Sequence, residues 1–456
     1  MFQPSKYQQA IFDAIAHGTG DIVVEAMAGA GKSSTIREAV TRLPRARRAD
    51  CLVLAFNAQI AKEMEGKLQG TGATVKTNHA FGLAAVKAHF GIAPSNRNYV
   101  EKDKERELVR TWMETHPQLE LDRKEKYDEE RNVLALVHFL KVTLTDENNA
   151  ESVWGMAGAY NLETGDTDVQ QDRLLACARA VMQWSVYGLP RPRKGKRYGA
   201  DECISFDDMI WLPARLELTT PTFGLVLVDE SQDLNAAQLA LALKAKGQTG
   251  RLCAVGDRRQ AIYAFCGADA RSFARIAEIT HAQILPLSVC YRCPRSVVNE
   301  AKQIVPQIEA APNAPEGVVS YLKEEQAWGI LGREHGRGAS RAATQTMVLC
   351  RTTAPLITAA FDLIARGVPA TVRGTDIGAR LVSLIDTLEK APDFAFSRFL
   401  EACEVYRTLQ TALLRQKSGE NANLLIAALD DRVDSVQAVY HAALDRGART
   451  TGDMRS

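Results

Sequence analysis

The sequence has 456 residues, of which 46% are hydrophobic and 24% are charged. These fractions are ordinary for a globular protein, and the length predicts roughly three domains, or two domains with insertions. Because the formal net charge is only +1, the molecule as a whole does not attract polyanions strongly, and any contact with nucleic acid must come from local patches.

The cysteines and the N-terminal residues indicate the compartment. The nine cysteines have no paired spacing apart from Cys290 and Cys293, and an odd number without a secretory segment indicates reduced thiols. This single pair lacks the further ligands of a structural zinc site. The chain opens without the pattern of a signal peptide, and no apolar stretch reaches the ~20 residues of a membrane-spanning helix. We therefore expect a soluble, cytoplasmic protein without membrane contact.

Residues 21–43 predict a phosphate-binding loop between a strand and a helix. Residues 21–26 are a β-branched apolar run, and residues 33–43 have an amphipathic helical period. Small residues between them let backbone amides turn toward an anion at the helix N-terminus. Lys32 would reach the β- and γ-phosphates, and Ser33 would bind Mg²⁺. The expected nucleotide-binding residues of this loop are Ala26, which replaces the usual first glycine, Ala28, Gly29, Ala30, Gly31, Lys32, Ser33 and Ser34. The alternative is a simple small-residue turn.

Residues 83–202 predict charged helices rather than strands. Helical patterns cover residues 99–116, 131–144 and 172–188. A basic segment at 191–197 follows these helices, and another lies at 42–48. A solvated loop is the ordinary interpretation of each segment. For residues 191–197, a position along the path of a nucleic acid is an equally good alternative.

Residues 223–233, "FGLVLVDESQD", predict a buried strand that ends in paired acids. In open α/β sheets, ligands bind at the carboxyl ends of the strands. We therefore expect Asp229 to bind the metal ion and Glu230 to act as the general base for an attacking water. The alternative is a capped strand-to-helix loop, because Asp and Ser are good cap residues.

Residues 251–269 predict another buried strand, followed by a phosphate sensor and two aromatic residues. Gln260 suits contact with a γ-phosphate because its side chain is neutral and both donates and accepts hydrogen bonds. Tyr263 and Phe265 are two residues apart, so they lie on one side of an extended segment and could stack on nucleic-acid bases. The alternative is that both are ordinary core aromatics.

The order of these motifs resembles that of the UvrD/Rep/PcrA group of superfamily 1 DNA helicases. The matching segments are the phosphate loop, the acidic "DESQD", the "GDRRQAIY" run and the later "CYRCP". The resemblance implies an α/β fold of the P-loop NTPase (RecA-like) type with a parallel sheet. It also implies ATP and Mg²⁺ as cofactors, and single-stranded or partly duplex DNA as the partner. The implied activity is that of an ATP-dependent DNA helicase or translocase moving 3′ to 5′.

The resemblance implies further site residues as well. Gln8, or its neighbour Gln9, would hydrogen-bond adenine. Tyr291 would stack on adenine, and Arg292 would be an arginine finger toward the γ-phosphate. Single-stranded DNA would contact Phe56, Asn57 and His79, together with Tyr263 and Phe265. Without the resemblance, a lone histidine at position 79 would more often be structural.

By the same resemblance, the chain divides into four parts. Residues 1–82 and 203–285 would form the first motor domain, interrupted by the helical insertion 83–202. Residues 286–380 would form a partial second RecA-like domain, and residues 381–456 a helical segment similar to the start of the family's 2B insertion. Strands of the second domain are expected at 317–322, 346–351 and 368–374.

Nothing after Arg292 matches the family's later His-x-x-Lys-Gly-x-Glu motif or its Thr-Arg motif. We therefore expect either that the chain is a piece of a longer protein or that a second polypeptide supplies these motifs. Two functions follow: an active helicase or translocase, and a helicase derivative that binds ATP and single-stranded DNA with little turnover. The sequence does not decide between DNA repair, recombination and replication.

Overall fold

The computed structural model describes residues 3–116, 121–160, 162–164, 167–260, 272–323, 326, 346–365, 370–372, 377–391, 394–417 and 422–455. The chain divides into two compact units, Met1–Val319 and Ser320–Ser456. In its described residues the first unit holds a parallel sheet with helices around it, and the second is helical.

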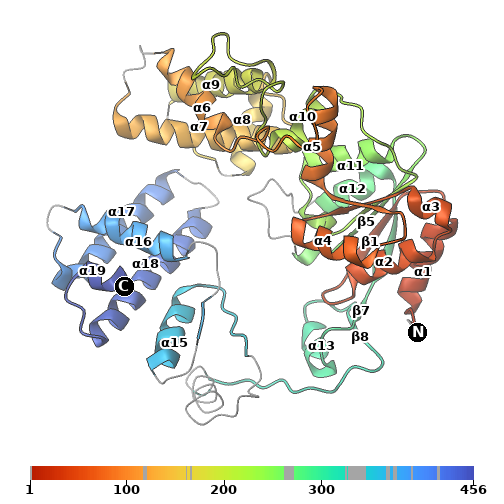
Figure 1. Cartoon of the computed structure of the whole chain (residues 1–456). Coiled ribbons are helices and arrows are strands. Elements are labelled where there is room, and N and C mark those ends of the chain that lie inside the picture. Colours follow the sequence, from red (N-terminus) through yellow and green to blue (C-terminus); the bar gives the residue numbers. More distant parts are fainter. Residues whose placement is uncertain are drawn as a thin grey trace. The chain divides into compact units, whose positions relative to one another are not determined.

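A parallel sheet of six strands forms the centre of the first unit (Figure 1), in the order β3-β2-β4-β5-β1-β6. The strands are β1 (Ile22–Ala26), β2 (Cys51–Ala55), β3 (Thr74–Thr77), β4 (Leu225–Val228), β5 (Arg251–Gly256) and β6 (Gln283–Leu287). Every neighbouring pair is parallel, so all six carboxyl ends lie at one edge of the sheet. The predicted α/β fold with a parallel central sheet is confirmed.

Helices pack on both faces of this sheet (Figure 1). Along β4, Leu225 and Leu227 belong to the core of one face, whereas Val226 and Val228 belong to the core of the other. The first face is covered by α1 (Lys6–His17), α2 (Lys32–Arg42) and α4 (Ala58–Lys67), and the second by α5 (Asn78–His89), α10 (Asp208–Arg215), α11 (Ala236–Lys246) and α12 (Ser272–Thr280). The short α3 (Arg45–Ala49) precedes β2. Burial on both faces explains why the strands read as continuous apolar runs.

A group of four helices, here called the helical lobe, lies in the chain between α5 and α10 (Figure 1). It consists of α6 (Lys104–Glu114), α7 (Arg123–Thr143), α8 (Ala150–Ala159) and α9 (Asp168–Tyr187). Leu108, Val137 and Val181 are buried inside it, and their core is continuous with that beneath α5 and α10. The helices predicted for this part of the sequence are therefore present, and they pack against the sheet-forming part rather than folding separately.

The first compact unit continues beyond residue 286, where we expected the second domain to begin. Strand β6 continues to Leu287 and pairs with β1 in the first sheet. Beyond it, β7 (Val289–Cys290) pairs with β8 (Glu309–Ala310), and α13 (Arg295–Ala301) buries Val298 in the core shared with α1 and α2. The first compact unit accordingly extends to Val319.

Two of the strands predicted for the second domain are not formed. Residues 317–323 and 346–350 have no regular secondary structure, and several of their apolar side chains, including Tyr321 and Leu349, are exposed. A strand needs a neighbour for its backbone groups, and no strand pairs with either segment among the described residues. Most of the third predicted strand, 368–374, lies outside the described residues.

The second unit is helical, as the sequence predicts from residue 381 onward. Its helices are α15 (Ala354–Ala365), α16 (Ile377–Glu389), α17 (Phe399–Lys417), α18 (Ala422–Asp445) and α19 (Thr451–Arg455). Phe399 of α17 stacks on Tyr440 of α18 with 4.8 Å between the ring centroids, and both lie in the core of this unit. In neither unit does a described helix have the length and apolar character needed to cross a membrane.

A close crossing of α5 and α10 gives a prediction about stability. A Cβ added to Gly82 of α5 would lie 2.0 Å from the Met209 carbonyl oxygen of α10, so Gly82→Ala should lower the free energy of unfolding by about 1–3 kcal/mol. Gly66 of α4 is the matched control, because its added Cβ would meet no atom within 4 Å and Gly66→Ala should be stabilising by up to about 1 kcal/mol. Urea denaturation measures both changes, and equal effects would contradict the crossing.

Candidate active site

The predicted phosphate loop joins β1 to α2 at the carboxyl edge of the sheet. Gly29 and Gly31 have φ angles of 71° and 80°, which only glycine adopts without strain. Gly31 precedes α2 and provides no side chain to cap it, so the first amides of the helix remain available to an anion. Of the other predicted loop residues, Ala26 and Ala30 are buried and Ala28 and Ser34 are exposed.

The two acids after β4 meet the side chains at the start of α2. Ser33 Oγ donates a hydrogen bond of 2.8 Å to Asp229 Oδ2, and the Lys32 ammonium forms an ion pair with the Glu230 carboxylate. Asp229 is only 2% exposed. Burial raises its pKa, and the adjacent Glu230 raises it further. The structure thus brings together four of the predicted site residues that lie about 200 positions apart.

The donor set fits a magnesium ion. Mg²⁺ prefers hard oxygen ligands and is usually held by one or two carboxylates together with substrate phosphates. Ser33 and Asp229 offer a hydroxyl and a carboxylate oxygen that already lie 2.8 Å apart.

Gln232, which we did not predict as a site residue, links the acids to the next strand. Its Nε2 donates to Glu230 Oε2 at 2.9 Å and to Asp233 Oδ2 at 3.2 Å. Its Oε1 accepts a hydrogen bond of 3.0 Å from the backbone N–H of Asp257, directly after β5. Gln232 is 2% exposed, so this amide ties two turns at the carboxyl edge together. The "DESQD" segment contained it, but its long-range partner was not visible in the sequence.

Gln260 lies at the same edge of the sheet, in a short 3₁₀ turn (Arg258–Gln260) after β5. Its backbone N–H donates to the Asp257 carbonyl at 2.9 Å, and its side chain is exposed. Arg258 pairs with Glu25 of β1 at 2.8 Å, which fixes the turn against the strand that carries the phosphate loop. Tyr263 and Phe265 lie outside the described residues.

Tyr291 and Arg292 pack against the phosphate loop. The backbone N–H of Tyr291 donates to the Gly29 carbonyl at 3.0 Å, and its hydroxyl donates to Gln8 Oε1 at 3.3 Å. A Cβ on Gly29 would lie 2.9 Å from the Arg292 Cβ, so Arg292 directly adjoins the loop. Gln8 is 2% exposed and also donates to Thr35 Oγ1 at 3.1 Å. These contacts place Tyr291 and Arg292 beside the phosphate loop and the first turn of α2.

The two glutamines that the sequence left as alternatives have different environments. Gln8 faces the phosphate loop through the contacts above, whereas Gln9 is exposed and donates to Asp13 Oδ1 on the outer side of α1 at 2.8 Å. Ser5 and Gln8 also form a capping box at the start of α1, which holds Gln8 in place. Gln8 therefore lies beside Tyr291 and the first turn of α2, whereas Gln9 lies away from both.

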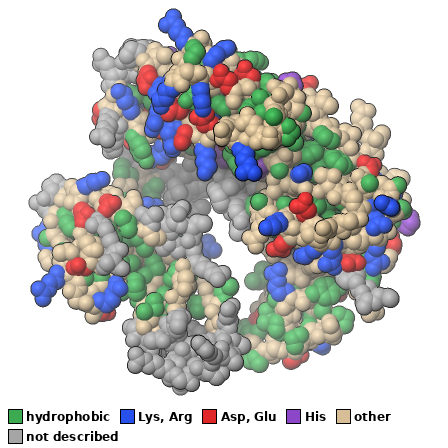
Figure 2. Space-filling model, viewed as in Figure 1, with side chains coloured by type: hydrophobic (Ala, Val, Ile, Leu, Met, Phe, Trp, Pro, Cys, Tyr) green, Lys and Arg blue, Asp and Glu red, His purple; other side chains and the backbone are tan. Residues whose placement is uncertain are grey.

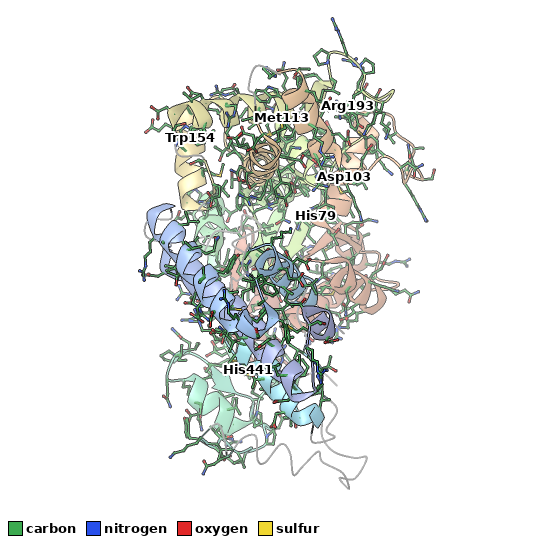
Figure 3. All side chains as sticks on the ribbon, turned by 90° about the vertical axis from the view of Figure 1, so that its left-hand side faces the viewer. His79, Asp103, Met113, Trp154, Arg193 and His441 are labelled. Carbon is green, nitrogen blue, oxygen red and sulfur yellow. The ribbon has the colours of Figure 1, made fainter. Side chains whose placement is uncertain are left out.

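The candidate DNA-contacting residues also follow carboxyl ends of strands. Phe56 and Asn57 come after β2 and His79 comes after β3. The Asn57 side chain accepts a hydrogen bond from the Ile60 backbone N–H at 2.9 Å, so it also caps α4. His79 stacks on Phe206 with 3.9 Å between ring centroids and 24° between planes, and it lies near the junction with the helical lobe (Figure 3). Burial lowers the pKa of His79 to about 4, so its ring is neutral at physiological pH.

Phe206 is a candidate contact that we missed. Its side chain is 59% exposed although it lies in an otherwise buried segment. Exposed aromatic rings at a ligand-binding edge provide stacking surfaces for nucleic-acid bases. The signal in the sequence was weak, because "ISFDDMIWLP" reads as an apolar return into the sheet domain and does not show which side chain points outward.

The basic segment at 191–197 is largely neutralised by acidic partners. Arg193 pairs with Glu107 at 3.2 Å and also with Glu114, and Lys196 pairs with Glu101 at 2.7 Å. Figure 2 shows basic and acidic side chains intermixed over the helical lobe, and Figure 3 labels Arg193 on that lobe. In the other basic cluster, Arg47 donates to the Ala16 carbonyl at 2.6 Å. The ion pairs weaken the alternative of a nucleic-acid path for residues 191–197, and the Arg47 contact ties residues 42–48 to α1.

Comparisons with known proteins agree with this geometry. A family model described as "UvrD/REP helicase N-terminal domain" matches residues 7–280, which is more than half of the chain. The matched range contains the phosphate loop, the acids and Gln260.

Several characterised relatives are similar over part of the chain. The ATP-dependent DNA helicase PcrA of Bacillus subtilis is 24% identical over 313 residues, which are 64% of this chain and 38% of the relative. The ATP-dependent DNA helicase Rep of Salmonella typhimurium is 24% identical over 311 residues, which are 64% of this chain and 42% of the relative. The Staphylococcus epidermidis protein with the PcrA name is 30% identical over 119 residues. The chain thus spans less than half the length of these relatives.

The contrast between Gln8 and Gln9 gives a matched pair of variants. Gln8→Ala should weaken the binding of ATP about tenfold, because it removes a hydrogen-bonding side chain beside the loop. Gln9→Ala should leave the affinity within about twofold, since Gln9 faces solvent. A fluorescent ATP analogue titrated into each variant measures this. Equal losses in both variants would show that Gln8 does not face the nucleotide.

Proposed function

The chain belongs to the UvrD/REP helicase family, and we propose that it is an ATP-dependent DNA helicase or translocase acting on single-stranded DNA. One observation carries the proposal. Lys32, Ser33 and the two acids after β4 converge at the carboxyl edge of one parallel sheet, and Arg292 adjoins the same loop. This arrangement supplies the groups that hydrolysis of a nucleoside triphosphate requires.

The loop and the acids suggest how ATP would be hydrolysed. The amides at the start of α2 and the Lys32 ammonium would bind the β- and γ-phosphates, with Lys32 exchanging its ion pair with Glu230 for the phosphates. Ser33 and Asp229 would hold Mg²⁺, which neutralises phosphate charge when bound. Because the raised pKa of Asp229 reflects burial and a like charge, a divalent cation would relieve both penalties.

The remaining groups would serve the chemical step. Glu230 would accept a proton from the water that attacks the γ-phosphorus, and ADP would leave with the bond between the β-γ bridging oxygen and phosphorus broken. Arg292 would stabilise the charge on the transferred group. Gln260 would sense the γ-phosphate, Gln8 would hydrogen-bond the adenine, and Tyr291 would stack on it. These roles extend the positions described above and rest on the family's chemistry.

Single-stranded DNA would lie across the edge where β2 and β3 end. Phe56, Asn57, His79 and Phe206 are arranged there, and Tyr263 and Phe265 belong to the segment that follows β5. Each stacked base would contribute about 1–3 kcal/mol. We also propose movement 3′ to 5′, a cytoplasmic location, and a second polypeptide as one source of the family's further motifs.

ATP hydrolysis by this chain tests the proposal directly. Single-stranded DNA should stimulate the rate at least about tenfold, and Lys32→Ala should abolish the stimulated rate because it removes the cation that binds the phosphates. Glu230→Gln should lower kcat while ATP still binds. A wild-type rate equal to the Lys32→Ala background would favour the derivative with little turnover. A rate of ATP hydrolysis that is the same with and without single-stranded DNA would contradict the helicase proposal.

The aromatic surface gives a separate prediction about DNA. Phe206→Ala and Tyr263→Ala should each weaken binding of oligo(dT) about tenfold, with ATP affinity unchanged, because each removes one stacking surface. Tyr187→Ala is the control, since Tyr187 is 67% exposed at the end of α9 in the helical lobe. Fluorescence anisotropy measures the affinities, and unchanged binding by Phe206→Ala would reject its stacking role.

A further inference from the structure

The segment that carries Phe206 is held by the helical lobe. Asp208, two residues later, is fully buried and receives a hydrogen bond of 2.7 Å from Lys104 of α6 and another of 2.7 Å from Lys141 of α7. Within the segment, the Ser205 backbone N–H donates to Asp208 Oδ2 at 3.0 Å, and the Asp208 N–H donates to Ser205 Oγ at 3.2 Å. Two helices of the lobe therefore converge on one carboxylate at the start of α10.

The buried charges in this cluster are satisfied. Lys104 also donates to the carbonyls of Ser185 and Cys203, at 2.8 and 3.0 Å. Lys141 also donates to Glu105 at 2.5 Å and to Ser185 Oγ at 3.2 Å. Each ammonium thus has three acceptors, which matches its three donors. Burial alone would raise the pKa of Asp208, but the two lysines outweigh it and hold the pKa well below its usual range. Fully satisfied buried networks rigidify the segments that they join.

A second contact from the lobe reaches the residue next to Phe206. The Nδ1 of His138, on α7, lies 2.7 Å from Asp207 Oδ2. Phe206, the residue before Asp207, stacks on His79 and is 59% exposed. His138 thus holds the side chain of the residue that follows Phe206.

Resting on the proposed binding of single-stranded DNA, we propose that His138 is a positioning residue for that binding. Through Asp207 it holds Phe206 against His79, so that the helical lobe sets the aromatic surface on which a base stacks. Lys104 and Lys141 hold the segment at Asp208. The His138–Asp207 pair holds it next to Phe206, and this is the contact whose strength changes with the protonation of His138.

The pair also makes the surface sensitive to pH. Burial lowers the pKa of His138, but the carboxylate of Asp207 outweighs this and the pKa is raised; Lys141 lowers it and Glu105 raises it further. Stabilisation by a group with a raised pKa is complete below about pH 6.5 and is lost as pH rises through the folded-state pKa. DNA affinity should therefore fall as the pH rises from about 6.5 through the raised pKa of His138. His79 stays neutral in this range, because its pKa is about 4.

A double-mutant cycle tests whether His138 acts through Phe206. His138→Ala should weaken binding of oligo(dT) about fivefold in the wild-type background and by less than about twofold in the Phe206→Ala background. Additive losses would overturn the proposal. Thermal unfolding of each variant, measured in parallel, separates a loss of affinity from a loss of folded protein.

The pH profile provides a readout that a purely structural role would not move. His138→Asn keeps a donor near the Nδ1 position but does not titrate, so it should bind DNA with near wild-type affinity at pH 7. Between pH 6 and pH 9 the wild type should lose about twofold more affinity than this variant, because the neutral ring can still donate a hydrogen bond to Asp207. His116→Asn is the control, because His116 belongs to the helical lobe but stacks on Trp112, and it should keep the wild-type profile.

The outcomes distinguish this inference from the proposed function. A wild-type chain that does not bind oligo(dT) would overturn both. Normal DNA binding that Phe206→Ala weakens, with identical pH profiles for wild type and His138→Asn, would overturn only the role of His138.

Discussion

The parallel pairing of six strands is the constraint on which the site depends. Because β1, β4 and β5 run in the same direction, the turns that follow them meet at one edge, and residues separated by about 200 positions become neighbours. The strands are buried on both faces, so hydrophobic packing fixes their register. The hydrogen bond from Ser33 to Asp229 and the ion pair of Lys32 with Glu230 are consequences of that register. A change in strand order would separate all four groups.

Two groups of buried charge show how environment separates structural from functional carboxylates. Asp208 has two lysine partners, and its pKa lies well below the usual range. Asp229 has a hydroxyl donor but also an acidic neighbour, and its pKa is raised. Burial and Glu230 likewise raise the pKa of Asp233 to about 6. The first carboxylate is satisfied within the protein, whereas the acids after β4 would be stabilised by the cation that we propose for this site. Carboxylates whose pKa is raised by burial and by a neighbouring acid are typical of functional sites.

The helical lobe holds the segment on the proposed DNA side of the site. Its charged residues mostly pair with one another, so the lobe offers less net positive charge to DNA than its basic segment suggested. Its contribution is instead mechanical, because α6 and α7 hold the segment that precedes α10 and presents Phe206. On the nucleotide side, Gln232 joins the acidic turn to the turn after β5. Because Gln232 contacts both turns, a movement of the acidic turn can displace the turn after β5 directly.

Residue types and their spacing predict the phosphate loop, the paired acids after a strand, the position of Gln260 after another strand and the helices within residues 83–202. These features depend on residue type and short spacing: glycines where φ must be positive, a Lys-Ser pair opening a helix, carboxylates after an apolar run. Long-range contacts were needed to show that Gln8 rather than Gln9 lies beside Tyr291 and α2. They were also needed to show that Phe206 is exposed beside His79, that acids pair with residues 191–197, and that the first unit extends to Val319. Each of these depends on partners far apart in the chain, and local pattern carries no information about which distant groups meet. The prediction of strands at 317–322 and 346–351 was wrong for the same reason, because a strand forms only where a neighbouring strand supplies its hydrogen bonds.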